Sequence, residues 1–220
     1  MNKSPRKTQI YLVLPDGDGI AAGHELEPIL DQELIVCCLQ QFNDGDQSSV
    51  RTRPELQILC NFVQSRDVAF VLENDLFLAK ELGADGVHFS LTGQSRDRDT
   101  ALPNFEHCLS VLDADPIIGS MTDGTKHQAM MIGEQAVSYL GFCKSYNGQN
   151  STDFELMKWW NDNFVVPSVA FDINSDNDLD LALTYGADFV SLELARDANI
   201  SEAIEQAQHV AEKIENFFGS

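Results

Sequence analysis

The sequence has little positive charge. Its 14 lysines and arginines stand against 35 aspartates and glutamates, and the formal net charge is −21. A nucleic-acid-binding protein needs a basic surface to neutralise phosphates, and an anionic membrane surface repels so acidic a chain. We therefore expect no nucleic acid and no membrane among its partners, and we assign the acidity to solubility.

Long hydrophobic runs are also missing. No stretch approaches the roughly 20 apolar residues of a membrane span, and the basic start MNKSPRKTQ is followed only by IYLVLP, which is short for a signal-peptide core. The five cysteines form no Cys-x-x-Cys pair, and most lie within apolar patterns, as buried, reduced thiols do. These features predict a cytoplasmic protein.

Short apolar runs alternate with stretches of helical periodicity along the chain. The runs are rich in Val, Ile, Leu and Phe, as strands buried on both faces of a parallel sheet are. Eight strands alternating with eight helices predict a single (βα)8 TIM barrel of the α/β class, with a doubly wound open sheet as the alternative. No linker divides the chain, so we expect one domain over residues 1–220, with residues 1–8 flexible. Strands are expected at 9–15, 34–40, 68–73, 86–90, 116–121, 137–142, 167–173 and 189–194, and helices at 24–32, 53–65, 74–82, 104–112, 124–135, 152–163, 176–186 and 200–218.

One helix-to-strand corner occurs twice. DLFLAKELGADGVHFSL (75–91) and DLDLALTYGADFVSLEL (178–194) match at 9 of 17 positions without a gap. In each, the glycine suits a left-handed helix end, and the aspartate can bond the backbone of the turn. Asp85 and Asp188 would lie at the N-terminal ends of strands, the stability face of a barrel, so we interpret both as structural. Asn74 is the expected N-cap of the first of these helices.

The segment VLENDLFLAKELGADGVHF (71–89) resembles a central motif of the thiamine phosphate synthase and thiazole tautomerase superfamily, and PIIGSMTDG (116–124) and VSYLGF (137–142) follow in that family's order. The resemblance extends over roughly residues 9–194. It implies a barrel that joins an aminopyrimidine diphosphate to a thiazole phosphate, with Mg²⁺ as cofactor if the chain is an active synthase. Ligands would be small phosphorylated or thiamine-related molecules, and a homodimer through the outer helices is left open.

The anion-binding positions that the resemblance implies have changed. CCLQQFN (37–43) contains no Arg or Lys, although Gln40 or Gln41 can stand in for a family glutamine. SLTG (90–93) lacks the family's second metal carboxylate, and the pair at 171–172 replaces a Gly-Gly that lets the backbone approach a phosphate. Three acidic residues would flank the mouth, and three arginines are available to offset them: Glu73, Asp172 and Glu193, and Arg96, Arg98 and Arg196.

Several residues have the chemistry that a ligand site needs. Lys144 is expected at the end of the sixth strand, where a lysine between apolar walls can act as a nucleophile; a solvated lysine is the alternative. His88 would face the mouth as an acid, a base or a ligand contact, or serve as a hydrogen-bonded structural histidine. Glu73 is the third catalytic candidate, and Asp75 is the candidate metal ligand. The ligand-binding candidates are Gln40, Asn74, Ser90, Thr122, Ser145, Asp172 and Asn174.

Three functions remain open. The loss of the anion-binding set favours a divergent, non-catalytic relative that binds a small ligand, and a mouth filled by Met121 and Phe171 would support it. The alternative is an active thiamine phosphate synthase, which a phosphate site near residues 172–174 would support. A further alternative is different barrel chemistry that uses Lys144, which a buried Lys144 beside a carboxylate would support.

Overall fold

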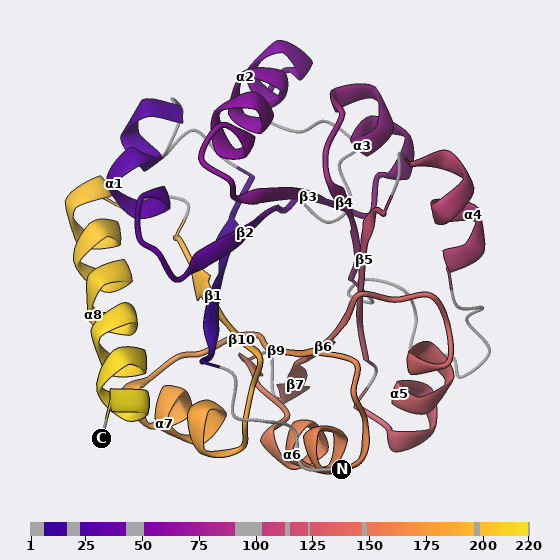
Figure 1. Ribbon diagram of the computed structural model, residues 1–220, viewed down its shortest axis with the longest axis vertical. Coiled ribbons are helices and arrows are strands. Elements are labelled where there is room, and N and C mark those ends of the chain that lie inside the picture. Colours follow the sequence, from indigo (N-terminus) through magenta and orange to yellow (C-terminus); the bar gives the residue numbers. More distant parts are fainter. Residues whose placement is uncertain are drawn as a thin grey trace.

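The computed structural model describes residues 7–16, 23–42, 51–90, 103–112, 115–122, 124–146, 149–195 and 199–219, with the backbone alone at 144–146, 149 and 150. Its parallel strands close into a barrel in the order β1-β10-β9-β6-β5-β4-β3-β2, seen along its axis in Figure 1. The predicted TIM barrel is confirmed, and the open-sheet alternative is wrong because β1 pairs with both β2 and β10. The barrel strands are β1 (Gln9–Leu14), β2 (Ile35–Gln40), β3 (Ala69–Glu73), β4 (Gly86–Phe89), β5 (Ile117–Met121), β6 (Tyr139–Phe142), β9 (Ser168–Ala170) and β10 (Phe189–Glu193).

The helices surround the barrel as an outer ring (Figure 1). Each longer helix buries one apolar stripe against the strands; in α2 this stripe is Leu56, Leu59, Cys60 and Val63. The first unit has the shortest helices, a 3₁₀ turn followed by one α-helical turn. The helices are η1 (Gly23–Leu26), α1 (Glu27–Leu30), α2 (Arg53–Gln64), α3 (Leu76–Leu82), α4 (Phe105–Val111), α5 (Lys126–Gly133), α6 (Phe154–Asn163), α7 (Asp176–Thr184) and α8 (Ile200–Gly219).

The apolar core has two parts. The larger part lies between the strands and the helices, and the smaller part fills the inside of the barrel, as expected for a fold whose interior is packed rather than hollow. Because side chains alternate along a strand, residues two apart on each barrel strand share the same part. The inner cluster consists of Tyr11, Val13, Cys37, Leu39, Val71, Met121, Tyr139, Val169 and Phe171.

The two Gly-Ala-Asp corners have the same construction. Gly83 and Gly186 have φ angles of 65° and 73°, the left-handed conformation expected at these helix ends. The Asp85 carboxylate accepts a hydrogen bond of 2.7 Å from an amide of β3, and the Asp188 carboxylate accepts one of 3.0 Å from the first amide of β9. Each aspartate therefore satisfies an amide near the start of the preceding barrel strand, in agreement with the structural interpretation.

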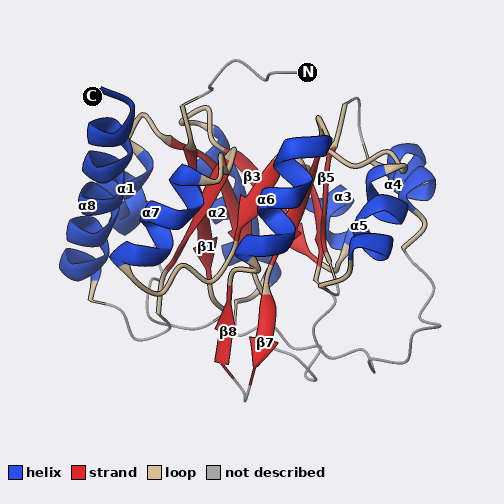
Figure 2. Ribbon diagram, turned by 90° about the horizontal axis from the view of Figure 1, so that it is seen from below, coloured by secondary structure: helices blue, strands red, loops and turns tan. Residues whose placement is uncertain are grey.

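A two-stranded antiparallel hairpin, β7 (Lys144–Tyr146) and β8 (Gln149–Ser151), follows β6. It projects from the barrel at the end opposite the C-terminal end of α8 (Figure 2). The hairpin was not predicted. Since β7 and β8 do not belong to the barrel, β9 and β10 are its seventh and eighth strands. At the other end of the barrel, Thr8 belongs to the segment expected to be flexible, but it is buried and donates to the Ala187 carbonyl at 2.7 Å. No described helix is long and apolar enough to cross a membrane.

Candidate functional site

The candidate site lies at the mouth of the barrel, where the C-terminal ends of the strands meet. Ligand sites of this fold are built at that end. Glu73 and Glu193 are the last residues of β3 and β10, and Met121 is the last residue of β5. The mouth-facing side chains described below come from these strands, from His88 in β4, and from the residues that directly follow β6 and β9.

Glu73 and Ser90, two of the predicted site residues, are hydrogen-bonded to each other at the mouth. The Glu73 side chain is 7% exposed; its Oε2 accepts from the Phe42 amide at 3.1 Å, and the Ser90 hydroxyl donates to its Oε1. Both carboxylate oxygens therefore have donors within the protein. Glu73 ties the connection after β2 to the connection after β4.

His88 lies inside the barrel and is 1% exposed. Its Nδ1 is 2.8 Å from the Tyr139 hydroxyl, which is in turn hydrogen-bonded to the Tyr11 hydroxyl. Its Nε2 has no hydrogen-bond partner within the described part of the chain. Burial lowers the pKa of His88 to about 3, because removal from water disfavours the imidazolium form. The ring is therefore neutral at pH 7 and offers no positive charge to a phosphate.

Large side chains fill the barrel just below the mouth, and two glycines make room for them. A Cβ atom at Gly119 would lie 2.1 Å from the Tyr139 ring, and one at Gly141 would lie 2.5 Å from the Met121 sulfur and 2.8 Å from the Phe171 ring. Met121 and Phe171 are 8% and 4% exposed. The barrel interior just below the mouth is therefore closely packed with side chains of the protein.

Asp172, Glu193 and Cys143 form an acidic group where β6, β9 and β10 end. The Asp172 amide donates to Glu193 Oε1 at 2.9 Å, the Ser191 hydroxyl donates to the same oxygen at 3.0 Å, and the Cys143 thiol donates to Asp172 Oδ2 at 2.6 Å. Although Glu193 is exposed at the mouth, protein atoms crowd its carboxylate, and this desolvation together with the charge of Asp172 raises the pKa of Glu193. Burial and the bond to Asp172 raise the pKa of Cys143, so its thiol is protonated at pH 7.

Asn74 and Asp75 shape the turn between β3 and α3. Asn74 has a φ of 54°, and its side chain accepts from the Ser90 amide at 3.0 Å. The N-cap of α3 is Asp75, whose carboxylate accepts from the Leu78 amide at 2.8 Å. The expectation that Asn74 caps this helix is wrong, because its left-handed backbone belongs to the turn that leaves the strand.

The described residues do not fit a protein-held Mg²⁺ site. Mg²⁺ prefers carboxylate and other oxygen ligands in near-octahedral geometry. Asp75 already uses one carboxylate oxygen for the helix cap, and the run SLTG (90–93), where the resemblance places a second carboxylate, contains none. In the part of the chain that the structure describes, no group of three or more His, Cys, Asp and Glu residues could hold a metal.

Gln40 points away from the mouth. It is fully buried at the end of β2, and because Leu39 faces the inside of the barrel, strand alternation turns Gln40 toward the helices. Its Nε2 donates to the Gln41 carbonyl at 2.8 Å, and its Oε1 has no partner among the described residues. Of the two glutamines considered from the sequence, the alternation favours Gln41 as the one at the mouth.

Four more candidates lie around the mouth, but the structure does not bring them into one cluster. The Thr122 hydroxyl accepts from the Gly124 amide at 3.3 Å, and Asn174 donates to the Asp172 carbonyl at 2.8 Å. Lys144 does not end β6: that strand stops at residue 142, and Lys144 and Ser145 begin β7 of the hairpin. The structure describes only the backbone of Lys144, and its role as a nucleophile stays a prediction. Arg96, Arg98 and Arg196 lie outside the described residues.

Sequence reasoning overlooked several residues of this region. Tyr11 and Tyr139 face the inside of the barrel. Residues two apart on a strand share a face, so the spacing of these tyrosines from Val13 and Gly141 could have revealed this. Arg51 gave no such signal, because it lies beyond a stretch with no regular pattern. It is 8% exposed, and its charge opposes the rise in the pKa of Cys38 that burial causes. Cys38 belongs to the outer part of the core, and Arg51 is close enough for its charge to act there.

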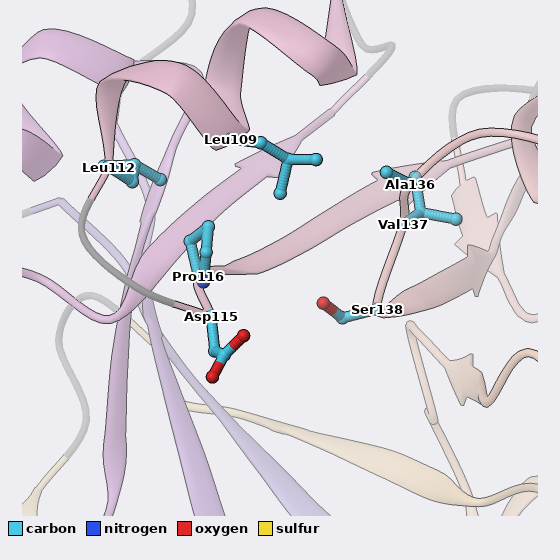
Figure 3. A pocket seen from close by; sticks show the side chains of 7 residues that line it. All are labelled: Leu109, Leu112, Asp115, Pro116, Ala136, Val137 and Ser138. Atoms are coloured by element: carbon cyan, nitrogen blue, oxygen red, sulfur yellow. The ribbon is translucent and has the colours of Figure 1, made fainter.

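A groove of about 540 Å³ opens at the opposite end of the barrel, between the end of α4 and the starts of β5 and β6 (Figure 3). This end of a TIM barrel serves stability rather than catalysis, and the Ser138 hydroxyl is already used there to accept from the Ile118 amide at 3.0 Å. The groove is therefore separate from the candidate site. Its lining is mostly apolar: Leu109, Leu112, Asp115, Pro116, Ala136, Val137 and Ser138.

Comparison with known proteins identifies the family of this chain. Residues 10–195 match the family described as thiamine monophosphate synthase. The chain is 29% identical over 191 residues to a thiamine-phosphate synthase of Rhodospirillum centenum and 28% identical over 195 residues to one of Erythrobacter litoralis; each match covers 84% of this chain and 86% of the relative. The solved structure of thiamine phosphate pyrophosphorylase from Pyrococcus furiosus has a TM-score of 0.69 at 16% identity, covers 94% of this chain and 97% of its own, and bears on the fold alone.

Proposed function

This chain belongs to the thiamine monophosphate synthase family, and we propose that it is a divergent member that binds a thiamine-related or other small ligand at the barrel mouth without carrying out the synthase reaction. The chemistry of the described mouth carries this proposal, and Met121 and Phe171, which pack against Gly141 below the mouth, are consistent with it. A diphosphate leaving group also needs cationic or metal partners. His88 is neutral, and the described side chains of the mouth include carboxylates instead.

The first test is a synthase assay. Purified protein, shown to be folded by its thermal unfolding transition, is incubated with the aminopyrimidine diphosphate, the thiazole phosphate and Mg²⁺, and thiamine phosphate is quantified by fluorescence after oxidation. We expect no product above a no-enzyme control. Turnover that disappears when Mg²⁺ is removed would refute the proposal, because it would show that an anion site exists in spite of the mouth.

The second test is for binding. Thiamine, its unphosphorylated pyrimidine and its unphosphorylated thiazole are titrated while the unfolding temperature is followed, since a ligand that binds only the folded state raises it. Glu73→Gln alters a mouth residue, and Glu134→Gln alters an exposed residue at the end of α5. We expect a ligand-induced shift that Glu73→Gln changes and Glu134→Gln does not. Equal shifts in both variants would place the ligand away from the mouth.

An active synthase is the second candidate, and one observation favours it. The curated relatives that match over most of their length are named thiamine-phosphate synthases, and Mg²⁺ would then accompany the reaction. The synthase assay decides between the two candidates. For either one, the expected compartment is the cytoplasm, because all five cysteines are free thiols, four of them buried.

A further inference from the structure

A carboxylate of the protein occupies the place where many TIM barrels bind phosphate. In this fold, the loops after the seventh and eighth strands often form a phosphate site whose donors are backbone amides. Those strands are β9 and β10 here. The first amide after Phe171 belongs to Asp172, and it points its hydrogen at Glu193 Oε1, 2.9 Å away.

The contact is a small anion site that is already filled. Glu193 Oε1 accepts from a backbone amide and also from the Ser191 hydroxyl at 3.0 Å, and two donors of this kind are what a phosphate oxygen would require. Ser191 is 4% exposed and faces inward on β10 together with Glu193. Glu193 is thus fixed by a donor on its own strand and by a donor on the neighbouring connection.

The surroundings would repel a second anion. The Asp172 carboxylate lies beside Glu193, close enough to help raise the pKa of Glu193, and its Oδ2 accepts from the Cys143 thiol. Within the described residues, neither carboxylate forms an ion pair with a lysine or an arginine. A phosphate arriving at this amide would have to displace one negative charge and approach another.

We propose that Glu193 is a built-in anion that takes the phosphate position of this barrel, so that the ligand of the mouth has no phosphate at the end that faces β9 and β10. Glu193 is therefore a specificity-determining residue, and it selects neutral or cationic groups at this end. The class of ligand rests on the proposed function, whereas the occupation of the phosphate position by Glu193 does not.

The test uses inorganic phosphate as the probe and the Asp172 amide as the reporter. Amide proton and nitrogen shifts of ¹⁵N-labelled protein are followed during phosphate titration at constant ionic strength. Glu193→Ala removes the carboxylate, Glu193→Gln keeps an acceptor oxygen without the charge, and Glu212→Ala, at an exposed position of α8, removes the same charge elsewhere. We expect saturable movement of the residue-172 signal in Glu193→Ala, with phosphate bound at least tenfold more tightly than by the wild type or Glu212→Ala, and an intermediate affinity in Glu193→Gln.

Two results would overturn the inference. One is saturable phosphate binding at this amide by the wild-type protein as tight as that of Glu193→Ala. The other is no binding by Glu193→Ala when its spectrum shows a folded protein. Glu193→Ser replaces the alanine variant if the latter does not fold, and the same two results apply to it. A positive synthase assay would refute the proposed function and the ligand class, whereas the phosphate titration alone decides whether Glu193 fills the site.

Discussion

Asp172 is a non-glycine residue in the left-handed region, with a φ of 57°, and a pair of substitutions there can measure what that backbone costs. Asp172→Gly and Asp172→Ala both delete the carboxylate, its bond from the Cys143 thiol and its repulsion of Glu193. The two variants therefore differ only in the Cβ atom. We expect Asp172→Gly to be the more stable of the two.

The size of the difference follows from two opposing terms. A left-handed backbone costs an L-residue such as alanine about 1–2 kcal/mol, and glycine is spared this cost. Glycine in turn loses about 0.5–1 kcal/mol more conformational entropy than alanine when the chain folds. The balance favours the glycine variant by about 0.5–1 kcal/mol.

Urea unfolding at pH 7 measures this difference, because the midpoint shifts while its slope stays constant. The matched control is Glu205 on the exposed face of α8, where the order should reverse: Glu205→Ala should be more stable than Glu205→Gly by about 1 kcal/mol, since glycine is unfavourable inside a helix. If Asp172→Ala proved as stable as Asp172→Gly while the control pair behaved as stated, the left-handed backbone at residue 172 would be refuted as a source of strain.

Three more predictions concern the barrel itself. Gly141→Ala should destabilise the fold by about 1–3 kcal/mol, because its Cβ would meet the Met121 sulfur at 2.5 Å, and adding Met121→Ala should recover part of this loss in urea unfolding. Burial lowers the pKa of His88 to about 3 from 6.5, so between these pH values only the unfolded chain binds a proton at this residue. The free energy of unfolding should therefore fall by about 1.4 kcal/mol per pH unit as the pH decreases from 6.5 to 3. His88→Gln should remove that part of the pH dependence. Asp85→Ala and Asp188→Ala should each lower the free energy of unfolding by about 1–3 kcal/mol, because each leaves a strand amide unpaired. Neither variant should change the ligand-induced shift of the unfolding temperature.

Most of the barrel could be predicted from the sequence, because each of its elements is marked by local chemistry. Apolar runs became all eight barrel strands, β1, β2, β3, β4, β5, β6, β9 and β10, and the repeated Gly-Ala-Asp fixed two helix ends. The hairpin was missed because Lys144–Tyr146 and Gln149–Ser151 are polar and show no apolar alternation. Such a pair is defined by its mutual backbone bonds, which leave no periodic signal.

The site was predictable in position but not in its internal contacts. The resemblance and the strand pattern predicted Glu73, His88 and Asp172 at the mouth; Glu73 and Asp172 lie where their strands end, whereas His88 is buried inside the barrel. The resemblance and the pattern could not show that Glu73 bonds to Ser90, or that the Asp172 amide bonds to Glu193. These contacts depend on the relative heights of neighbouring strands in the closed barrel, and that stagger is a property of the whole sheet rather than of any one segment.

Stability and ligand chemistry occupy opposite ends of the same strands. At one end, Asp85, Asp188 and Ser138 each accept a hydrogen bond from an amide of the preceding barrel strand. At the other end, the backbone amide of Asp172 is present and correctly placed for an anion, but Glu193 has replaced the anion. The described hydrogen bonds of the corners and of the mouth involve different residues, so a substitution at the mouth should leave the corners that hold the barrel together undisturbed. The proposed function relies on this separation, because it requires the family fold to persist while the chemistry of the mouth changes.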